Sequence, residues 1–273
     1  MEVAGYKITT IVPEYLSLDG GAMFGLVPKT LWSKLITPDE QNRIRLSCRV
    51  LLLEGHGKKI LVDLGAGRKW NEKEKSIYNI EYVDKPLHEQ VSGITDIILT
   101  HLHFDHAGGI SKLVQGNSEL SFPDARVFIQ ERHLQHARTK GVRDQASFLS
   151  ENLQPLEQAK LSLTNDGDEI LPRISVHRID GHTHGQQWVK IGEGRDVACF
   201  VADLIPTAHH LRVPYVMGYD LSAERAIEEK KDFLEKAVEE NWCVIFEHDS
   251  ATQAVRLKRD DKGHIVIAKA ESI

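Results

Sequence analysis

The sequence predicts a layered domain that mixes α-helices and β-strands over residues 1–273. Short apolar runs rich in β-branched residues alternate with helical patterns, and no linker stands out between them. A chain of 273 residues can also bury a large core without help from disulfides or a structural metal. Many strands with interspersed helices in one undivided chain favour an α/β (α+β) architecture in layers.

Composition excludes several classes of protein. The content of 41% hydrophobic and 27% charged residues is that of a globular chain, and the net charge of −6 with scattered basic residues argues against a nucleic-acid partner. Cys48, Cys199 and Cys243 each sit in an apolar run, as buried thiols do. The N-terminus lacks a signal-peptide pattern and no apolar stretch reaches membrane-spanning length, so we expect a cytoplasmic protein with no membrane partner.

The expected strands are short runs of apolar and β-branched residues. In chain order they are Lys7–Val12, Leu46–Glu54, Lys59–Asp63, Asp96–Thr100, Arg126–Gln130, Ser175–Ile179, Gln187–Ile191, Val197–Val201 and Cys243–Phe246.

Fewer helices are expected. The clearest lies within residues 221–241, where Ala226, Phe233 and Ala237 share one face, Ser222 is a candidate N-cap, and the charged residues are interpreted as a solvated face. Others are predicted after Gly109, around residues 130–139 and around residues 146–160.

The stretch THLHFDHAGG, residues 100–109, concentrates titratable side chains at the end of a predicted strand. His101 and His103 are two apart and can point the same way, while Asp105 and His106 follow as the chain turns. Imidazole nitrogens with a carboxylate suit Zn²⁺ and also tolerate iron or manganese. Four ligands within six residues diverge too much for one tetrahedral ion, so two adjacent metals are expected.

Three more candidates follow later strands: His182 in GHTHG, Asp203 in FVADL and His248 in FEHD. A single such histidine is most simply a surface residue. Seven ligand-type residues that all recur at strand ends are better explained by one metal site.

As a set, these motifs resemble those of the metallo-β-lactamase-fold metallohydrolases, over roughly residues 45–250. The string His-x-His-x-Asp-His at 101–106 is followed by Gly-His182-Thr, Ala-Asp203 and Glu-His248, and ILVDLGAG around Asp63 is similar to an earlier motif of that family. The resemblance implies a four-layered αββα sandwich with the metals at one edge between the two sheets.

The resemblance also implies a ligand assignment. His101, His103 and His182 would hold the first of two divalent ions, most simply Zn; Asp105, His106 and His248 would hold the second, and Asp203 would bridge them. Together with Asp105, Asp203 would hold a metal-bridging hydroxide for catalysis. Asp63 is expected to orient a ligand rather than bind a metal.

His182 and His184 compete for one ligand position, and the family pattern favours His182, which leaves His184 near the site mouth.

Two positions depart from the lactonase branch of that family. Gln186 stands where relatives often have a second histidine, and Pro206 stands where lactonases tend to have a tyrosine that contacts substrate. Tyr215 or Tyr219 could substitute for that tyrosine.

Substrate choice is expected to depend on residues outside the metal motifs. Residues 17–35 are interpreted as a flexible loop carrying Met23, Phe24, Leu26 and Trp32, similar to that of methyl-parathion-hydrolase-like and lactonase-like members. A second apolar run, LRVPYVMGY, follows His209 and His210. These two histidines either line the site mouth or, more simply, belong to a solvated loop. Each apolar run is either a pocket wall or a core or dimer contact, so a homodimer stays open.

The resulting hypothesis is a dinuclear metal hydrolase that cleaves a small, fairly apolar ester, lactone or phosphotriester. The alternatives are an iron-dependent redox enzyme on the same ligands, a phosphodiesterase, and a metal-stabilised binding protein. The last is disfavoured, because a structural zinc site closes its coordination sphere and this ligand set leaves room for water.

Overall fold

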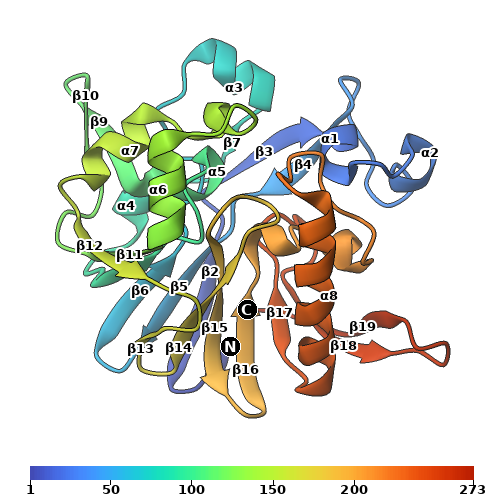
Figure 1. Ribbon diagram of the computed structural model, residues 1–273. Helices are drawn as coiled ribbons and strands as arrows, with labels where there is room; N and C mark the ends of the chain where they lie inside the picture. Colours follow the sequence, from blue (N-terminus) through green and yellow to red (C-terminus); the bar gives the residue numbers. More distant parts are fainter.

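Two seven-stranded sheets form the centre of the computed structural model, which describes residues 1–273 (Figure 1). The first sheet has the order β1 (Glu2–Val3), β2 (Tyr6–Ile11), β5 (Val50–Gly55), β6 (Lys58–Val62), β8 (Asp96–Ile98), β11 (Arg126–Gln130) and β12 (Lys160–Thr164). The second has the order β13 (Glu169–Leu171), β14 (Ile174–Ile179), β15 (Gln186–Glu193), β16 (Asp196–Phe200), β17 (Cys243–Ile245), β18 (Ala254–Arg259) and β19 (Ile265–Glu271).

Two smaller sheets lie beside these. One orders β4 (Arg43–Ser47), β3 (Glu14–Asp19) and β7 (Glu81–Tyr82), and the other is the hairpin β9 (Ser111–Val114) and β10 (Asn117–Leu120).

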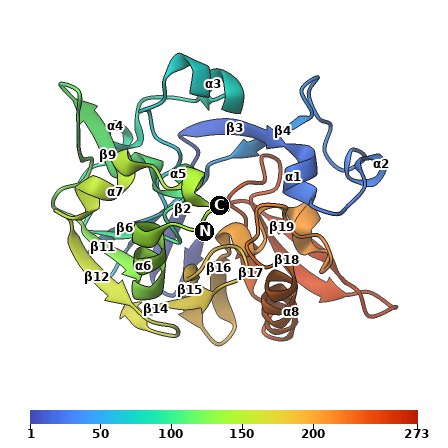
Figure 2. The same ribbon diagram turned by 45° about the horizontal axis from the view of Figure 1, so that its top comes forward.

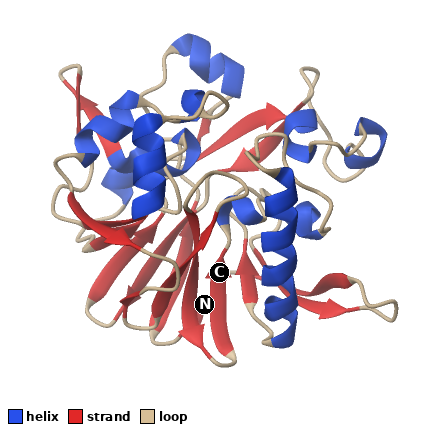
Figure 3. Cartoon of the chain, viewed as in Figure 1, coloured by secondary structure: helices blue, strands red, loops and turns tan.

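Helices cover the outer faces of both large sheets (Figure 3). The α-helices are α1 (Gly20–Phe24), α2 (Lys29–Trp32), α3 (Glu72–Tyr78), α4 (Leu87–Gln90), α5 (Phe104–Ala107), α6 (Glu131–Thr139), α7 (Ser150–Leu156) and α8 (Ala223–Glu239). Short 3₁₀ turns are η1 (Gly108–Ile110), η2 (Gln145–Ser147), η3 (Ala202–Leu204) and η4 (Ala208–Leu211). None of the helices is both long and apolar enough to cross a bilayer.

The two sheets pack face to face, and strand β5 shows why. Its side chains alternate: Leu51 and Leu53 enter the core between the sheets, whereas Val50 and Leu52 enter the core beneath α6 and α7. Since successive side chains on a strand point to opposite faces, a strand buried on both sides must be apolar throughout. The arrangement is the αββα sandwich that the resemblance implies.

The topology collects strand ends at one edge. Strands β6, β8 and β11 are parallel in the first sheet, and β16 and β17 are parallel in the second. Their carboxyl ends therefore point to the same side, where β3, β4, α1 and α3 lie across the edge (Figure 2).

Most expected strands are confirmed, but the one at residues 46–54 is wrong in part. The chain leaves β4 in a small sheet at Ser47 and enters β5 of the large sheet at Val50. Because residues 46–53 are all buried, the apolar pattern continues across the break and could not reveal it.

The helix predicted after Gly109 is also wrong. α5 precedes that residue, and the hairpin β9–β10 follows it. The glycines serve close packing instead: a Cβ on Gly108 would lie 2.1 Å from the carbonyl oxygen of Ala66. The helix expected around residues 146–160 is shorter, at Ser150–Leu156, because β12 begins at Lys160.

Candidate metal centre

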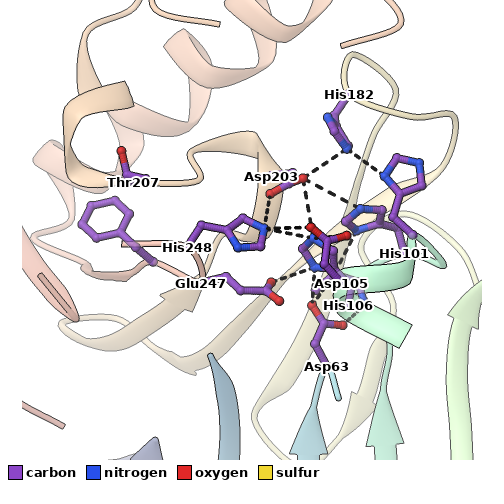
Figure 4. A network of polar contacts seen from close by, with 12 residues as sticks. Asp63, His101, Asp105, His106, His182, Asp203, Thr207, Glu247 and His248 are labelled. Atoms are coloured by element: carbon purple, nitrogen blue, oxygen red, sulfur yellow. Dashed lines mark hydrogen bonds and ion pairs between the residues drawn. The ribbon is translucent and has the colours of Figure 1, made fainter. Parts of the chain in front are cut away.

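Side chains from both large sheets converge at the shared edge (Figure 4). All are at most 8% exposed, and each follows the end of a strand in the chain. They are His101, His103, Asp105 and His106 after β8, His182 after β14, Asp203 after β16 and His248 after β17.

Four overlapping groups of side chains have their potential ligand atoms within 4.8 Å of one another. Two of them share no residue: His101, His103 and His182 form one, and Asp105, His106 and His248 form the other. The remaining two are His101, His106 and Asp203, and Asp63, His106 and Glu247. The structure thus brings together the two sets that the resemblance implies.

Asp203 lies between the groups. Its Oδ2 is 3.2 Å from Nε2 of His182, and its Oδ1 is 3.1 Å from Nε2 of His248. One carboxylate oxygen faces each group, which is the geometry that a bridging ligand requires.

Several histidines are oriented through the ring nitrogen that faces away from the centre. Nδ1 of His248 lies 2.8 Å from the carbonyl oxygen of Ser47, and Nδ1 of His182 lies 2.9 Å from Oδ1 of Asp220. A neutral imidazole that donates from Nδ1 keeps the lone pair of Nε2 for a metal.

Asp63 orients two ligands and lies behind them. It accepts from the backbone N–H and hydroxyl of Thr100, at 2.7 and 2.6 Å, and lies 3.1 Å from Nδ1 of His106. Since the Thr100 hydroxyl donates to Asp63, it can accept from Nδ1 of His101 at 3.1 Å. Asp63 holds a positive φ of 54°, a backbone strain of the kind found at functional sites.

A test of fit for a metal comes from atoms that have no hydrogen-bond partner. Nε2 of His101 and Nε2 of His103 are buried without one. A buried unpaired polar atom costs about 1–3 kcal/mol. Neutral imidazole and carboxylate are the ligands that Zn²⁺ and related ions take, so these residues fit a divalent metal.

Electrostatics of the centre follow from burial and mutual proximity. Burial, reinforced by the neighbouring imidazoles, holds the pKa of His101 and of His103 well below the usual range. Burial alone would raise the pKa of Asp203, but the facing His248 and His182 outweigh it and place that pKa well below its usual range. Burial alone would lower the pKa of His106, His182 and His248, but the carboxylates that face these rings outweigh it and raise the pKa of all three. The centre therefore offers neutral imidazoles at His101 and His103 and an ionised carboxylate at Asp203.

A cavity of about 380 Å³ opens onto the metal candidates. His103, Asp105, His182, Asp203 and His248 form its base. The walls are mainly apolar and aromatic with a few polar groups: Leu18, Met23, Tyr78, Phe104, Arg143, Asp144, Ala146, Ser147, Met217, Gly218 and Tyr219.

Of the apolar residues predicted near the N-terminus, only Met23 lines this cavity. Phe24 and Trp32 are buried in the core behind the cavity wall and stack with ring centroids 5.6 Å apart, and Leu26 is 99% exposed. Residues 17–35 fold as the end of β3, α1, α2 and the turns that join them, so the prediction of a loop is wrong. The sequence shows that this stretch is apolar, but it does not show which side of α1 faces the cavity.

Of the residues predicted between 209 and 219, some line the cavity and others do not. Tyr219 lines the cavity, whereas Tyr215 packs edge-on against Phe24. His209 borders a smaller pocket of about 160 Å³ next to His248.

The structure contradicts the predicted positions of His184 and His210. His184 is exposed and packs against the ring of His136, away from the cavity. His210 is fully buried instead of solvated; it lies 2.8 Å from the Thr207 hydroxyl and 2.9 Å from the carbonyl oxygen of Met23.

Three residues that contact the candidate ligands were not predicted from the sequence in this role. Glu247 lies 2.8 Å from Nδ1 of His106, and Asp220 holds His182. Gln186, noted only as a departure, places its amide against the backbone N–H groups of Asp203 and Leu204; because both are donors, the amide oxygen is assigned to that side, at 3.1 and 3.2 Å. Glu247 adjoins a ligand in FEHD and could have been found from that position, but Asp220 follows no motif.

Comparison with solved structures supports the fold. Over the full chain, the protein superposes with a TM-score of 0.89 and 26% identity on a structure from Staphylococcus aureus described as a probable metal-dependent hydrolase, covering 99% of that chain. AidC, a dizinc quorum-quenching lactonase, gives a TM-score of 0.77 at 20% identity, covering 98% of this chain and 96% of that one. The hydrolase AbOPH gives 0.75 at 19%, covering 100% and 99%.

A comparison with proteins of curated function gave no match. Residues 43–248, which carry every candidate ligand, match the family model of the metallo-beta-lactamase superfamily. The chain therefore belongs to the metallo-β-lactamase superfamily.

Proposed function

We propose that the protein is a dinuclear metal-dependent hydrolase that cleaves a small, fairly apolar ester, lactone or phosphotriester. The observation that carries the proposal is that five candidate ligands line the base of an open cavity, and that the buried Nε2 atoms of His101 and His103 have no hydrogen-bond partner. A structural metal site would be closed to solvent, whereas this one faces a cavity that can admit substrate.

The chain would hold two divalent ions between its two ligand groups, with Asp203 shared. When bound, such ions supply a hydroxide near neutral pH and polarise the substrate oxygen. The chain's own residues set the geometry: Asp63 and Glu247 orient His106, Asp220 orients His182, and the Ser47 carbonyl orients His248.

The shape of the cavity supports a small, mostly apolar substrate. Met23, Phe104 and Met217 give an apolar wall, and Tyr78 and Tyr219 bring hydroxyl groups that could orient a substrate oxygen. Because Tyr219 lines the cavity and Tyr215 does not, Tyr219 is our candidate for the role of the tyrosine absent at Pro206. Support also comes from the solved neighbours, among which AidC is a lactonase crystallised with N-hexanoyl-homoserine as product.

One observation favours a second candidate, a phosphodiesterase. Arg143 lines the cavity, and no carboxylate lies within ion-pair distance of its guanidinium. Its only hydrogen bond goes to the Gly218 carbonyl, so its charge is available to an anionic substrate.

The test combines metal analysis with a substrate panel. Natively purified protein is expected to carry two transition-metal ions per chain, and metal-reconstituted protein should hydrolyse lactones, aryl esters or phosphotriesters in preference to phosphodiesters. Purified protein that contains no transition metal would contradict the proposal. Purification with iron and no hydrolysis on the panel would transfer support to the redox alternative, and a preference for phosphodiesters would favour the second candidate.

Replacement of the shared carboxylate tests the assignment of Asp203. Asp203→Asn should lower kcat/KM by more than about 100-fold, beyond the 10–100-fold typical for residues that only orient a ligand. Asp232→Asn, an exposed position on α8, is the matched control and should keep full activity. Unchanged hydrolysis in Asp203→Asn would contradict the assignment.

A further inference from the structure

We propose that His133 is a positioning residue that joins the two loops carrying the three-histidine group and so sets the separation of His101 and His103 from His182. His133 lies on α6, outside every ligand motif of the sequence. The inference rests on the proposed metal centre but on no particular substrate.

Both ring nitrogens of His133 contact backbone, one in each loop. Nε2 lies 2.8 Å from the backbone N–H of Leu102, the residue between His101 and His103. Nδ1 lies 2.9 Å from the carbonyl oxygen of His184, two residues after His182. The imidazole thus spans the gap between a loop of the first sheet and a loop of the second.

These two partners allow only one protonation state. The Leu102 N–H is a donor and must meet a lone pair, while the His184 carbonyl is an acceptor and must meet an N–H. His133 is therefore the neutral tautomer that carries its proton on Nδ1. Complete burial, which lowers its pKa to about 3, agrees with this state.

The start of α6 also fits closely against the second loop. Gly185 has a φ of 78°, and a Cβ at that position would lie 2.5 Å from the backbone nitrogen of His133. Arg132, the preceding residue, pairs with Asp180 at 2.8 Å, and Asp180 accepts from the Gly185 N–H at 2.8 Å. The helix end therefore forms a fixed support for residues 180–185.

A neutral link suits this location because it adds no charge to the centre. A lysine or arginine here would repel a divalent ion, and a carboxylate would not accept from Leu102 and donate to His184 at once. Removal of the link should let the two loops separate and weaken the three-histidine group. Asp105, His106 and His248 make no contact with His133 through either nitrogen, so their group should be affected less.

The experiment measures metal binding by three variants of the full chain. Co²⁺, whose visible absorption reports its ligands, is titrated against a competing chelator to give the affinity of each of the two sites. His133→Leu removes both hydrogen bonds. His133→Gln offers an amide acceptor and donor in place of the two ring nitrogens. His210→Leu controls for the loss of an equally buried, doubly hydrogen-bonded histidine that joins no loop carrying a histidine ligand.

We expect His133→Leu to weaken one site by about 10–100-fold and spare the other, with much of the loss restored in His133→Gln. His210→Leu should lower stability without this selective effect. Equal affinities in wild type and His133→Leu would overturn the inference. So would a loss of affinity in His133→Leu that is equally large at both metal sites.

A second measurement covers the case in which His133→Leu does not fold. Long-range ¹H–¹⁵N spectra of the wild-type apoprotein should show His133 as the Nδ1–H tautomer at pH 7; the other tautomer or a charged ring would overturn the inference. A wild-type chain that binds no metal would instead refute the proposed function, so the two failures are distinguishable.

Discussion

At the scale of the residue, the buried histidines differ in what they contact, and their partners determine their roles. His106, His182 and His248 have one nitrogen held by a carboxylate or carbonyl and turn the other toward the centre. His133 and His210 use both nitrogens on neighbouring groups and have none left for a ligand. The sequence shows each histidine, but only the fold shows its partners.

His210 predicts a loss of stability in acid. Burial lowers its pKa to about 3, whereas an unfolded histidine titrates near 6.5. Below pH 6.5 the unfolded chain therefore binds a proton that the folded chain refuses, and stability falls as the pH drops from 6.5 towards 3. Between pH 6.5 and 5 this single group should cost about 2 kcal/mol.

Urea unfolding of the metal-free protein at pH 7 and pH 5 measures the effect. His210→Gln should shrink the difference in unfolding free energy between the two pH values by about 2 kcal/mol relative to wild type. The same difference in both proteins would show that His210 does not oppose protonation. His133 contributes with the same sign in both and cancels in the comparison.

At the scale of the element, α8 shows which features of a helix a periodic pattern predicts and which it does not. The helix begins after the predicted cap, Ser222, whose hydroxyl accepts from the Arg225 N–H at 3.3 Å, and it buries the predicted face. Its charged face is not uniformly solvated: Lys230 is 1% exposed, and its ammonium donates to the carbonyl oxygens of Arg212 and Tyr215. The helix thereby holds the loop that leads to Met217 in the cavity wall.

Phe233 on α8 gives a prediction for this packing. It is 3% exposed and lies against Trp188 and Trp242, with ring centroids 5.0 and 5.7 Å away. Phe233→Ala removes a buried aromatic ring and leaves a cavity, so it should lower the free energy of unfolding by about 3–5 kcal/mol.

Asp232→Ala, at an exposed neighbour on the same helix, should change stability by less than about 0.5 kcal/mol. Chemical denaturation of both variants checks the comparison. A loss below 1 kcal/mol in Phe233→Ala would mean that α8 does not contribute to the core of the second sheet as its burial implies.

At the scale of the whole molecule, the candidate centre connects the two sheets, so metal should stabilise the fold. Its ligands come from His101 and His106 on one side and from Asp203 and His248 on the other. An ion that binds only the folded chain at 1,000 times its dissociation constant adds about 4 kcal/mol.

Thermal unfolding before and after chelation measures this contribution. Removing the metal should lower Tm by roughly 10 °C, given about 2–4 °C per kcal/mol for a chain of this size. Added Zn²⁺ should restore the original Tm. Coincident curves for treated and untreated protein would contradict a metal that joins the sheets.

Much of the fold was predictable because local patterns carry it. Strand β11 and helices α6 and α8 lie where apolar periodicity and capping place them. Strand β19, at the edge of the second sheet, and its neighbour β18 both carry several exposed residues, so their apolar patterns are weak and they went unpredicted. The switch of sheets at Cys48 and Arg49 was equally hidden, because both residues are buried.

The sequence by itself determined the ligand types and their places after strand ends, because ligand chemistry needs particular side chains at particular spacings. Only the tertiary structure decided what surrounds them: that Tyr219 and Met23 face the cavity while Phe24 and Trp32 do not, and that His133 joins two loops. Those contacts form between segments distant in the chain. Their geometry depends on how the two sheets pack, which no local pattern encodes.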